Sequence, residues 1–161
     1  MPSDNYLLMT GISGESQAQG MAKNIELETW GFGASNSADI GGTGLSAGKV
    51  SLADFSCSFA LDSASPTILI NLYTGKPIAT ATFTGKKSGG GTTTYNYLVI
   101  TMTNCYITSF STGGGASGVP IANLTLAYEQ IKYEYFTQDS KSGQTTNAGN
   151  ASYNIAQGLQ S

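Results

Sequence analysis

Glu26 and Glu28 are the residues whose type and spacing come nearest to a catalytic pair. Because the two residues are two positions apart on a predicted strand, their carboxylates project from the same face. Paired carboxylates perform acid–base chemistry when one of them has a raised pKa. Such a site also requires a second strand that completes a cleft around them. The alternative is a solvated or interface face, which is favoured because glutamate is usually exposed.

Two glycine-rich stretches approach nucleotide-binding patterns. Residues 42–47 fit G-x-G-x-x-A, and residues 85–88, Gly-Lys-Lys-Ser, approach a phosphate loop. The first pattern requires a strand before it and a helix after it, but here a strand is predicted to follow. The second lacks the Gly-Lys-Ser core and the helix, so a hairpin end with solvated Lys is favoured. We therefore predict no cofactor site.

Composition excludes several other kinds of site. The chain has no His, and all seven basic residues are Lys, which rules out His-based triads, His metal sites and Arg clamps on phosphate. Cys57 and Cys105 make a poor zinc site without His. Both are expected to be small buried side chains, and a disulfide between them remains an alternative. The net charge of -3 argues against nucleic-acid binding. No catalytic residue and no metal is expected.

The length of 161 residues is that of a single domain, residues 1–161. Charged residues make up only 11% of the chain, against about 25% in typical domains. Such a low fraction of charged residues is typical of surfaces that contact other proteins. The first residues resemble no signal peptide, and no apolar run is long enough to cross a membrane. We expect a protein that starts in the cytoplasm and does not insert into membranes.

Residues 119–136 predict one long, bent strand that closes a barrel. Leu124, Leu126 and Tyr128 alternate with polar or small residues, which is the period of a half-buried strand. The apolar positions then slip by one residue, to Ile131 and its odd-numbered successors. Such a slip turns later side chains to the opposite face unless a bulge intervenes, so we predict a β-bulge near Glu129 and Gln130.

A second strand is predicted over residues 24–32. Ile25, Leu27 and Thr29 face one way, whereas Glu26, Glu28 and Trp30 face the other. A lone Trp beside two Glu on an outward face suggests an edge that a loop or another subunit covers. We therefore expect an interface that includes Trp30, Glu26 and Glu28.

Residues 33–48 hold five glycines among Ser, Asn and Ala. A long loop without regular structure in a compact domain is usually functional or disordered, and we interpret this one as an extended arm. It is predicted to be a ring-stacking or inter-subunit loop, with these candidate residues: Gly33, Asn36, Gly41, Gly42, Gly44 and Gly48.

The remaining patterns complete a mainly β chain. Residues 49–61 predict a strand with another slip of its apolar positions. Residues 65–75 favour a helix over a buried strand, because Pro66 and Gly75 match the ends of a helix. Further strands are predicted at 6–12, 78–86 and 95–111. Residues 137–161 are expected to be a flexible C-terminal segment, with a short last strand at 153–156. Seven to eight strands and one helix indicate an antiparallel barrel or sandwich.

The sequence resembles the haemolysin-coregulated protein (Hcp) family, the inner-tube subunits of type VI secretion systems, which are related in fold to phage tail-tube proteins. The order and spacing of several stretches carry this resemblance: residues 6–16, 25–31, 41–50, 65–76, 109–114, 124–135 and 153–155. The chain departs from the family's usual pattern in lacking His in the arm and in having few basic residues.

The resemblance implies a single β-barrel of two antiparallel sheets, with one short flanking helix and a long Gly-rich extended loop. It further implies a homo-hexameric ring that stacks on copies of itself into a tube, which a contracting sheath expels and whose lumen can carry effectors. The implied partners are tip, sheath and effector proteins of the type VI system. Such subunits leave the bacterial cytoplasm without a signal peptide, and they have neither catalytic residues nor a cofactor.

Two other functions remain open from the residues. One is a secreted β-barrel binding module or effector chaperone, which would use Tyr128, Tyr133 and Tyr135, although aromatic side chains of this kind are more often core or interface. The other is an enzyme that uses the two glutamates at 26 and 28. It is the weakest, and we predict that the protein is not an enzyme.

Overall fold

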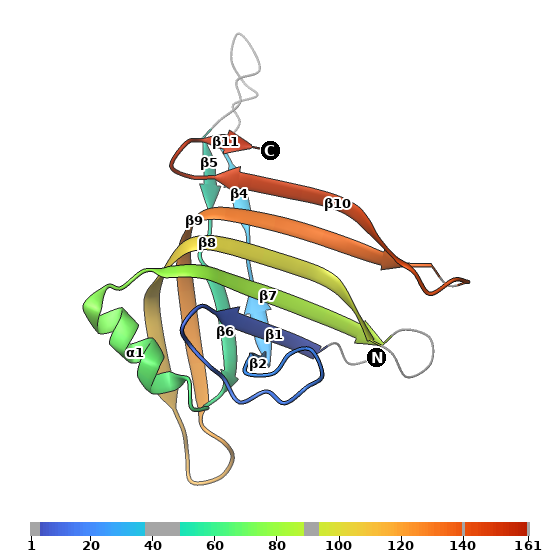
Figure 1. The fold of residues 1–161 in the computed structure, drawn as a ribbon. Coiled ribbons are helices and arrows are strands. Elements are labelled where there is room, and N and C mark those ends of the chain that lie inside the picture. The colour runs from blue at the N-terminus through green and yellow to red at the C-terminus, as the bar shows by residue number, and fades with distance from the viewer. Residues whose placement is uncertain (1–3, 38–48, 89–93, 140, 161) are drawn as a thin grey trace.

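A computed structural model describes residues 4–37, 49–88, 94–139 and 141–160, and over these residues the chain is mainly β with one helix (Figure 1). The elements in chain order are β1 Asp4–Met9, β2 Ile25–Leu27, β3 Thr29–Gly31, β4 Ala34–Asn36, β5 Val50–Leu52, β6 Phe55–Ala60, α1 Ser65–Thr74, β7 Ile78–Ser88, β8 Thr94–Gly113, β9 Ile121–Gln138, β10 Thr145–Asn154 and β11 Leu159–Gln160.

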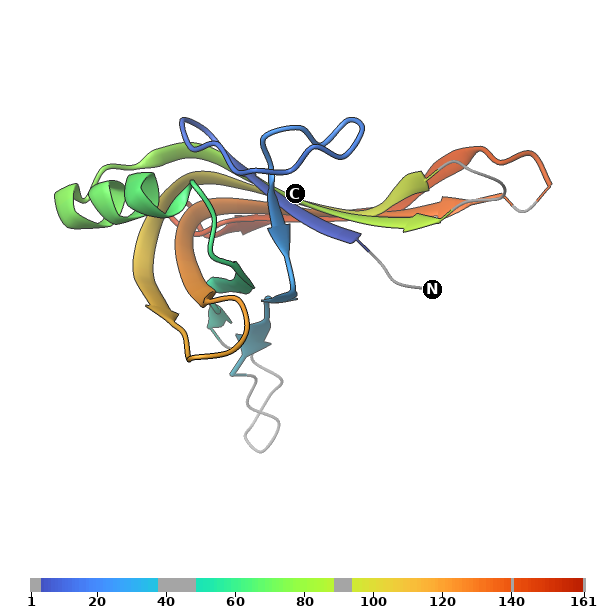
Figure 2. The ribbon, with the colours of Figure 1, turned by 90° about the horizontal axis from the view of Figure 1, so that it is seen from below.

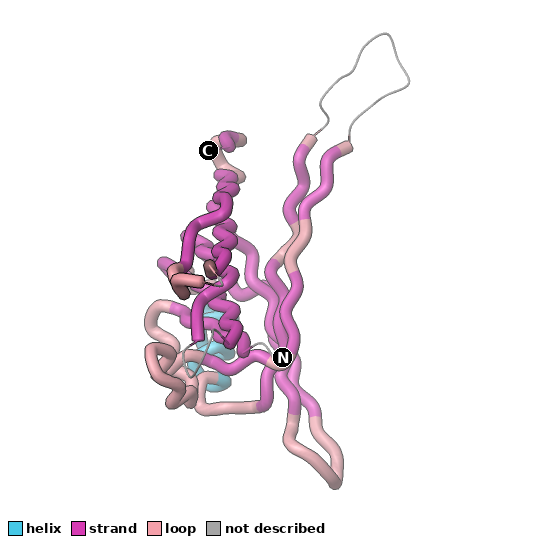
Figure 3. The backbone as a smooth tube through the Cα atoms, turned by 90° about the vertical axis from the view of Figure 1, so that its right-hand side faces the viewer, coloured by secondary structure: helices cyan, strands magenta, loops and turns pink. Residues whose placement is uncertain are grey.

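Most of the strands belong to one large antiparallel sheet that curls on itself. Its order is β11-β10-β9-β8-β7-β1-β2, and β6 joins the first half of β9 while β3 pairs with β6. Since only Glu28 separates β2 from β3, the sheet turns back there and forms a nearly closed barrel of two layers (Figures 2 and 3). Strands β4 and β5 form a separate two-stranded ribbon. The predicted barrel-like β fold is confirmed.

The predicted slip in β9 is confirmed. Leu126 and Tyr128 are buried, Glu129 and Gln130 are both exposed, and Ile131 is buried again. The strand therefore keeps one face toward the core through its bend, with Leu126 at 0% and Ile131 at 3% exposure.

The β-bulge predicted at Glu129 and Gln130 is wrong, because β8 slips at the same level. Cys105 pairs with Tyr128 and Thr103 with Gln130, so the register between β8 and β9 does not change there. A register shift between these two strands lies instead between Ile107 and Ser109.

Three neighbouring strands bend along one line. In β7, Ile78 and Ala81 are both buried, just as Met102 and Cys105 are in β8. Asn104 lies on this line with φ 53°, and its Nδ2 donates to Glu129 Oε2 at 2.6 Å. The bend is thus a property of the sheet, since each strand skips one position together with its neighbours.

Two breaks divide predicted strands in two. One is at Glu28, between β2 and β3, and the other is the slip predicted within residues 49–61, which lies at Ala53 and Asp54 and separates β5 from β6. The backbone N–H of Ala53 donates to the carbonyl of Gly33 at 2.8 Å, which holds this corner to the base of β4. These breaks explain why the described residues contain more strands than the seven to eight predicted.

The favoured helix is confirmed as α1, which packs beside β8. The helix begins at Ser65, one residue before Pro66, which the sequence pattern places at the first helical position. Ala64 is the N-cap residue, and the Asp62 carboxylate accepts its N–H at 2.8 Å. Gly75 ends the helix with φ 65°, a conformation that favours glycine. Within the described residues, no helix has the length and apolar character needed to span a membrane.

The C-terminal segment differs from its expected form. Residues 145–154 form β10, which pairs along β9 from Gln138 to Gln130, although residues 137–161 were predicted to be flexible. The short last strand predicted at 153–156 is the end of β10, and β11 follows it. Thr, Asn and Ser dominate β10 because most of its side chains are exposed, so backbone hydrogen bonds hold it without an apolar signal.

Cys57 and Cys105 are free and buried in the barrel core, as predicted. The core also holds three phenylalanines, Phe55, Phe59 and Phe83, each at 0% exposure. The two thiols therefore behave as small apolar side chains.

Candidate functional site

The three residues predicted at an interface lie on either side of the barrel corner. Glu26 is on β2, which pairs with β1, whereas Trp30 is on β3, which pairs with β6, and Glu28 is the residue between them. Both glutamates are exposed.

The predicted facing of Trp30 is wrong. Its ring lies 4.5 Å from that of buried Phe83, between centroids, so Trp30 turns toward the core and away from the face of the glutamates. The reason is the break at Glu28, whose N–H donates to the carbonyl of Ser58 and moves the chain onto the other layer. Thr29, predicted to face inward, is exposed instead, and its hydroxyl lies 2.6 Å from that of Ser58.

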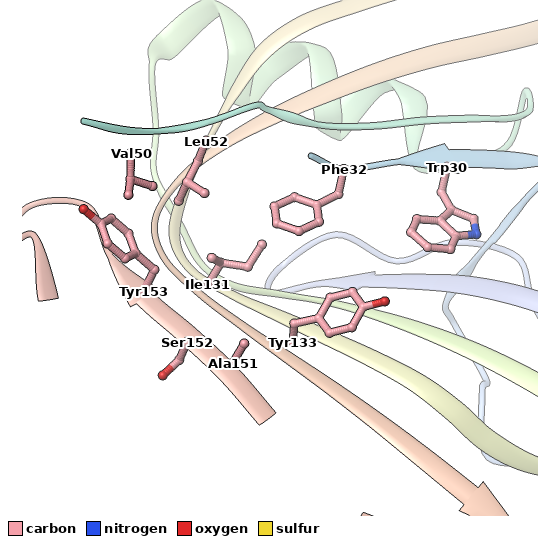
Figure 4. A pocket seen from close by; sticks show the side chains of 9 residues that line it. All are labelled: Trp30, Phe32, Val50, Leu52, Ile131, Tyr133, Ala151, Ser152 and Tyr153. Atoms are coloured by element: carbon pink, nitrogen blue, oxygen red, sulfur yellow. The ribbon is translucent and has the colours of Figure 1, made fainter. Parts of the chain in front are cut away.

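Trp30 forms one end of an apolar hollow of about 600 Å³ between the ribbon β4–β5 and the sheet β9–β10 (Figure 4). We call this feature the hollow. None of its lining side chains is charged: Trp30, Phe32, Val50, Leu52, Ile131, Tyr133, Ala151, Ser152 and Tyr153. Its size lies within the range of about 300–1,000 Å³ that is usual for binding sites.

Aromatic contacts fix the wall of the hollow. The ring of Phe32 lies 6.3 Å from that of Tyr133 and 6.5 Å from that of Tyr128. The Tyr128 hydroxyl donates to the carbonyl of Ala53 at 2.8 Å. Burial, helped by the nearby Asp54 carboxylate, raises the pKa of Tyr128 to about 12. The base of the ribbon is therefore held rigidly over the sheet.

Of the predicted arm residues, two lie at the two ends of the ribbon, Gly33 at its base and Asn36 at its far end. Gly33 precedes β4 and accepts the N–H of Ala53, and Asn36 pairs with Val50 across the ribbon. Gly41, Gly42, Gly44 and Gly48 lie outside the described residues, as does the dinucleotide-like stretch 42–47.

The main strand order of the large sheet leaves edges at β2 and at the β10–β11 end, and off this order β3 pairs only with β6. At one end, β2 pairs with β1 and has no further neighbour in the sheet order. At the other, β11 pairs only with Tyr153 and Asn154, so residues 145–151 of β10 have a strand neighbour on one side only within the described chain. The hollow lies directly beside the second edge, since Ala151 belongs to both.

Glu26 and Glu28 do not line one common site, which the catalytic alternative would require. Glu26 lines a depression of about 240 Å³ together with Glu15 and Asp62, whereas Glu28 does not line it. Burial raises the pKa of Asp62, and Glu15 adds to this effect, although hydrogen bonds from backbone N–H groups oppose it. Asp62 caps the turn into α1, which is a structural role. Across the described residues, no three potential metal ligands gather into one group.

The Gly-Lys-Lys-Ser stretch ends β7 rather than forming a phosphate loop. The ring of Tyr97 covers Gly85 so closely that an added Cβ would lie 2.8 Å from it, and the Lys87 ammonium lies 4.4 Å from the centre of this ring. The expected hairpin end is confirmed.

Sequence reasoning did not find the hollow itself. It named Trp30 and Tyr133 for other reasons but did not connect them with Phe32, Val50, Leu52 or Tyr153. A signal that could have found the hollow is the presence of large apolar side chains on both sides of the Gly-rich stretch, because a solvated loop rarely carries such side chains.

Comparison with known proteins finds one family to which this chain is similar. The family model described as "Type VI secretion system effector, Hcp" matches residues 6–135. Protein hcp1 of Pseudomonas aeruginosa is similar over 162 residues, with 29% identity and 99% of each chain covered.

Solved structures agree in fold. A type six secretion system protein superposes with a TM-score of 0.90 at 22% identity, over 99% of this chain and 100% of the other, which at this identity shows the fold alone. Hcp1 from Salmonella typhimurium superposes with a TM-score of 0.80 at 25% identity, over 100% of both chains.

Proposed function

This chain belongs to the Hcp family of type VI secretion proteins, and we propose that it is an inner-tube subunit that forms hexameric rings. Proteins of this family are secreted and structural, and it is not a family of enzymes. In the proposal, rings stack into a tube that sheath contraction expels, and the lumen can carry effectors.

The observation that carries the proposal is the pair of open edges, β2 and β10, at the two ends of one sheet. An edge strand presents unpaired backbone groups, and proteins protect it with charges, Pro or a covering element. Residues 145–151 contain neither Pro nor a charged side chain. Two different edges on one subunit support head-to-tail addition of copies, which closes into a ring when the rotation allows.

The low charge of the chain supports the same proposal. Only 11% of the residues are charged, so large surfaces can lose water without burying unpaired ions. Trp30, Glu26 and Glu28 remain our candidates for the contact between subunits, with Trp30 acting through the hollow.

The experiment is to measure the mass of the purified full-length protein in solution by native mass spectrometry and sedimentation velocity. We expect a hexamer, and rings in negative-stain images. A protein that stays monomeric at high concentration contradicts the proposal. Export into culture medium that depends on a functional type VI apparatus, with the N-terminus intact, tests the proposed route from the cytoplasm without a signal peptide.

The hollow favours one second candidate, a secreted binding module or effector chaperone. An aromatic, uncharged site of about 600 Å³ fits the general character of ligand sites. This function predicts saturable ligand binding by the monomer that Tyr133→Ala abolishes while assembly is unchanged. Binding that is absent from the monomer contradicts it.

A further inference from the structure

We propose that the hollow receives the turn between β8 and β9 of a second copy of this chain, with Val119 as the inserted side chain. The inference rests on the proposed ring and names the surfaces that meet within it. We call residues 114–120 together with Leu61 the apolar turn.

The apolar turn exposes large aliphatic side chains that the single chain does not use. Val119 is 67% exposed and Leu61 is 40% exposed. The N–H of Leu61 donates to the carbonyl of Pro120 at 2.9 Å, so the two segments lie together. Burying an exposed aliphatic pair of this kind against a partner removes apolar surface from water and so stabilises the complex.

Two glycines shape the turn that carries Val119. Gly114 lies against Pro120, where an added Cβ would be 3.2 Å from its Cγ, and Gly118 has φ 97°, a conformation that favours glycine.

The two surfaces match in chemistry. The residues lining the hollow are uncharged, and residues 113–121 contain no charged side chain. Leu61 borders the depression that Glu15, Glu26 and Asp62 also line, so the side chain placed in the hollow is Val119 and these carboxylates stay outside it. Aliphatic side chains can therefore enter between Phe32, Tyr133 and Tyr153 without stranding a charge, as in the core of a protein interface.

The two surfaces also lie at opposite ends of the molecule. In Figure 1 the ribbon β4–β5, which covers the hollow, is at the top, and the turn between β8 and β9 is at the bottom. One copy cannot bring its turn to its own hollow, so each copy gives its turn to one neighbour and receives the turn of another. Such a heterologous contact runs in the same direction as the joining of β2 and β10 edges.

The test uses Val119→Asp, with Ile70→Asp as the matched control, since both are exposed β-branched aliphatic side chains and Ile70 lies on α1, outside both surfaces. Burying an unpaired carboxylate in the hollow is costly, so Val119→Asp should raise the dissociation constant of the ring by at least about tenfold. Ile70→Asp should change it by less than about twofold. Sedimentation velocity across a concentration series measures both.

Trp30 gives a second readout because it is the only Trp in the chain and lines the hollow. In the wild type, its emission should move to shorter wavelength as rings form, since the hollow loses water. In Val119→Asp this shift should occur only at correspondingly higher concentration. Circular dichroism and thermal melting establish that the variant is folded.

A cross-link makes the result independent of stability. Val119→Cys and Ala151→Cys in one chain, treated with a short bismaleimide, should give covalent ladders of copies, while either single variant gives no ladder. The native thiols Cys57 and Cys105 are buried and serve as an internal control.

The outcomes separate this inference from the proposed function. Normal rings from Val119→Asp, or rings that form without a change in Trp30 emission and without cross-linked ladders, overturn the inference and leave the ring proposal standing. A wild-type chain that never assembles overturns the ring proposal, and the inference with it.

Discussion

Two thiols and one phenol lie in the barrel wall, where burial controls their ionisation. Burial raises the pKa of Cys57 to about 12 and that of Cys105 to about 11, the latter against a hydrogen bond with the backbone of Ala81. Burial likewise raises the pKa of Tyr128 to about 12. All three groups are neutral at physiological pH, so neither thiol acts as a nucleophile.

These three groups predict that the protein loses stability in alkali. In the unfolded chain, Cys ionises near about 8.5 and Tyr near about 10, so the unfolded state releases its protons first as pH rises. The stabilising contribution is complete below about 8.5 and disappears as pH rises toward the folded values. Urea unfolding at intervals from pH 7 to 11 should therefore show a falling free energy of unfolding above about pH 9. A constant value over this range contradicts the burial of these groups.

At the scale of elements, the main feature is a bend shared by β7, β8 and β9. Each strand passes two outward or half-buried positions at the same level, and the register between neighbours is kept. Asn104 adopts positive φ there, a conformation that Asn tolerates better than other residues with a Cβ. Beyond the bend, β9 changes its second partner from β6 to β10, so this line divides the barrel from the extended sheet.

The bend predicts different costs for two substitutions of Asn104. Both Asn104→Ala and Asn104→Gly lose the hydrogen bond to Glu129, which costs about 1 kcal/mol. The Ala variant keeps a Cβ at positive φ, as the wild type does, but lacks the local hydrogen bonding that lets Asn adopt this conformation, whereas Gly adopts it freely. The urea midpoint of the Gly variant should therefore lie above that of the Ala variant. Equal midpoints for the two variants would show that the backbone at this position is not strained.

At the scale of the whole molecule, the surfaces left open are those that copies of the chain would cover. The main strand order of the sheet ends in β2 on one side and in β10 with the short β11 on the other, and the hollow and the apolar turn lie at opposite ends. Under our proposal these surfaces join neighbouring copies in one direction, as a ring requires.

The Gly-rich stretch predicts an effect on stacking rather than on folding. We propose that deleting residues 41–44 weakens a contact between rings, because in the sequence these residues lie between β4 and β5 and belong to neither strand. The variant should unfold at the same temperature as the wild type and form hexamers, but it should form fewer or shorter tubes in electron micrographs. Tubes of unchanged length and number would refute the role of this segment.

The sequence alone determined much of this protein: the mainly β class, the slip in β9, the helix that ends at Gly75, the burial of both cysteines and the family. Each of these depends on local periodicity, on a residue with a restricted backbone or on the order of motifs, which a sequence displays directly. The facing of Trp30, the absence of a bulge at Glu129 and the existence of β10 could not be obtained in this way.

The tertiary structure decided those features because each depends on a partner strand. The bulge is absent since β8 slips with β9, and a slip in one strand predicts a bulge only when its neighbour stays regular. Trp30 faces inward because Glu28 bonds to Ser58 on a different strand, and polar β10 is a strand because β9 offers it an edge. The hollow exists only where ribbon, β9 and β10 meet, since residues more than 100 positions apart in sequence line it together.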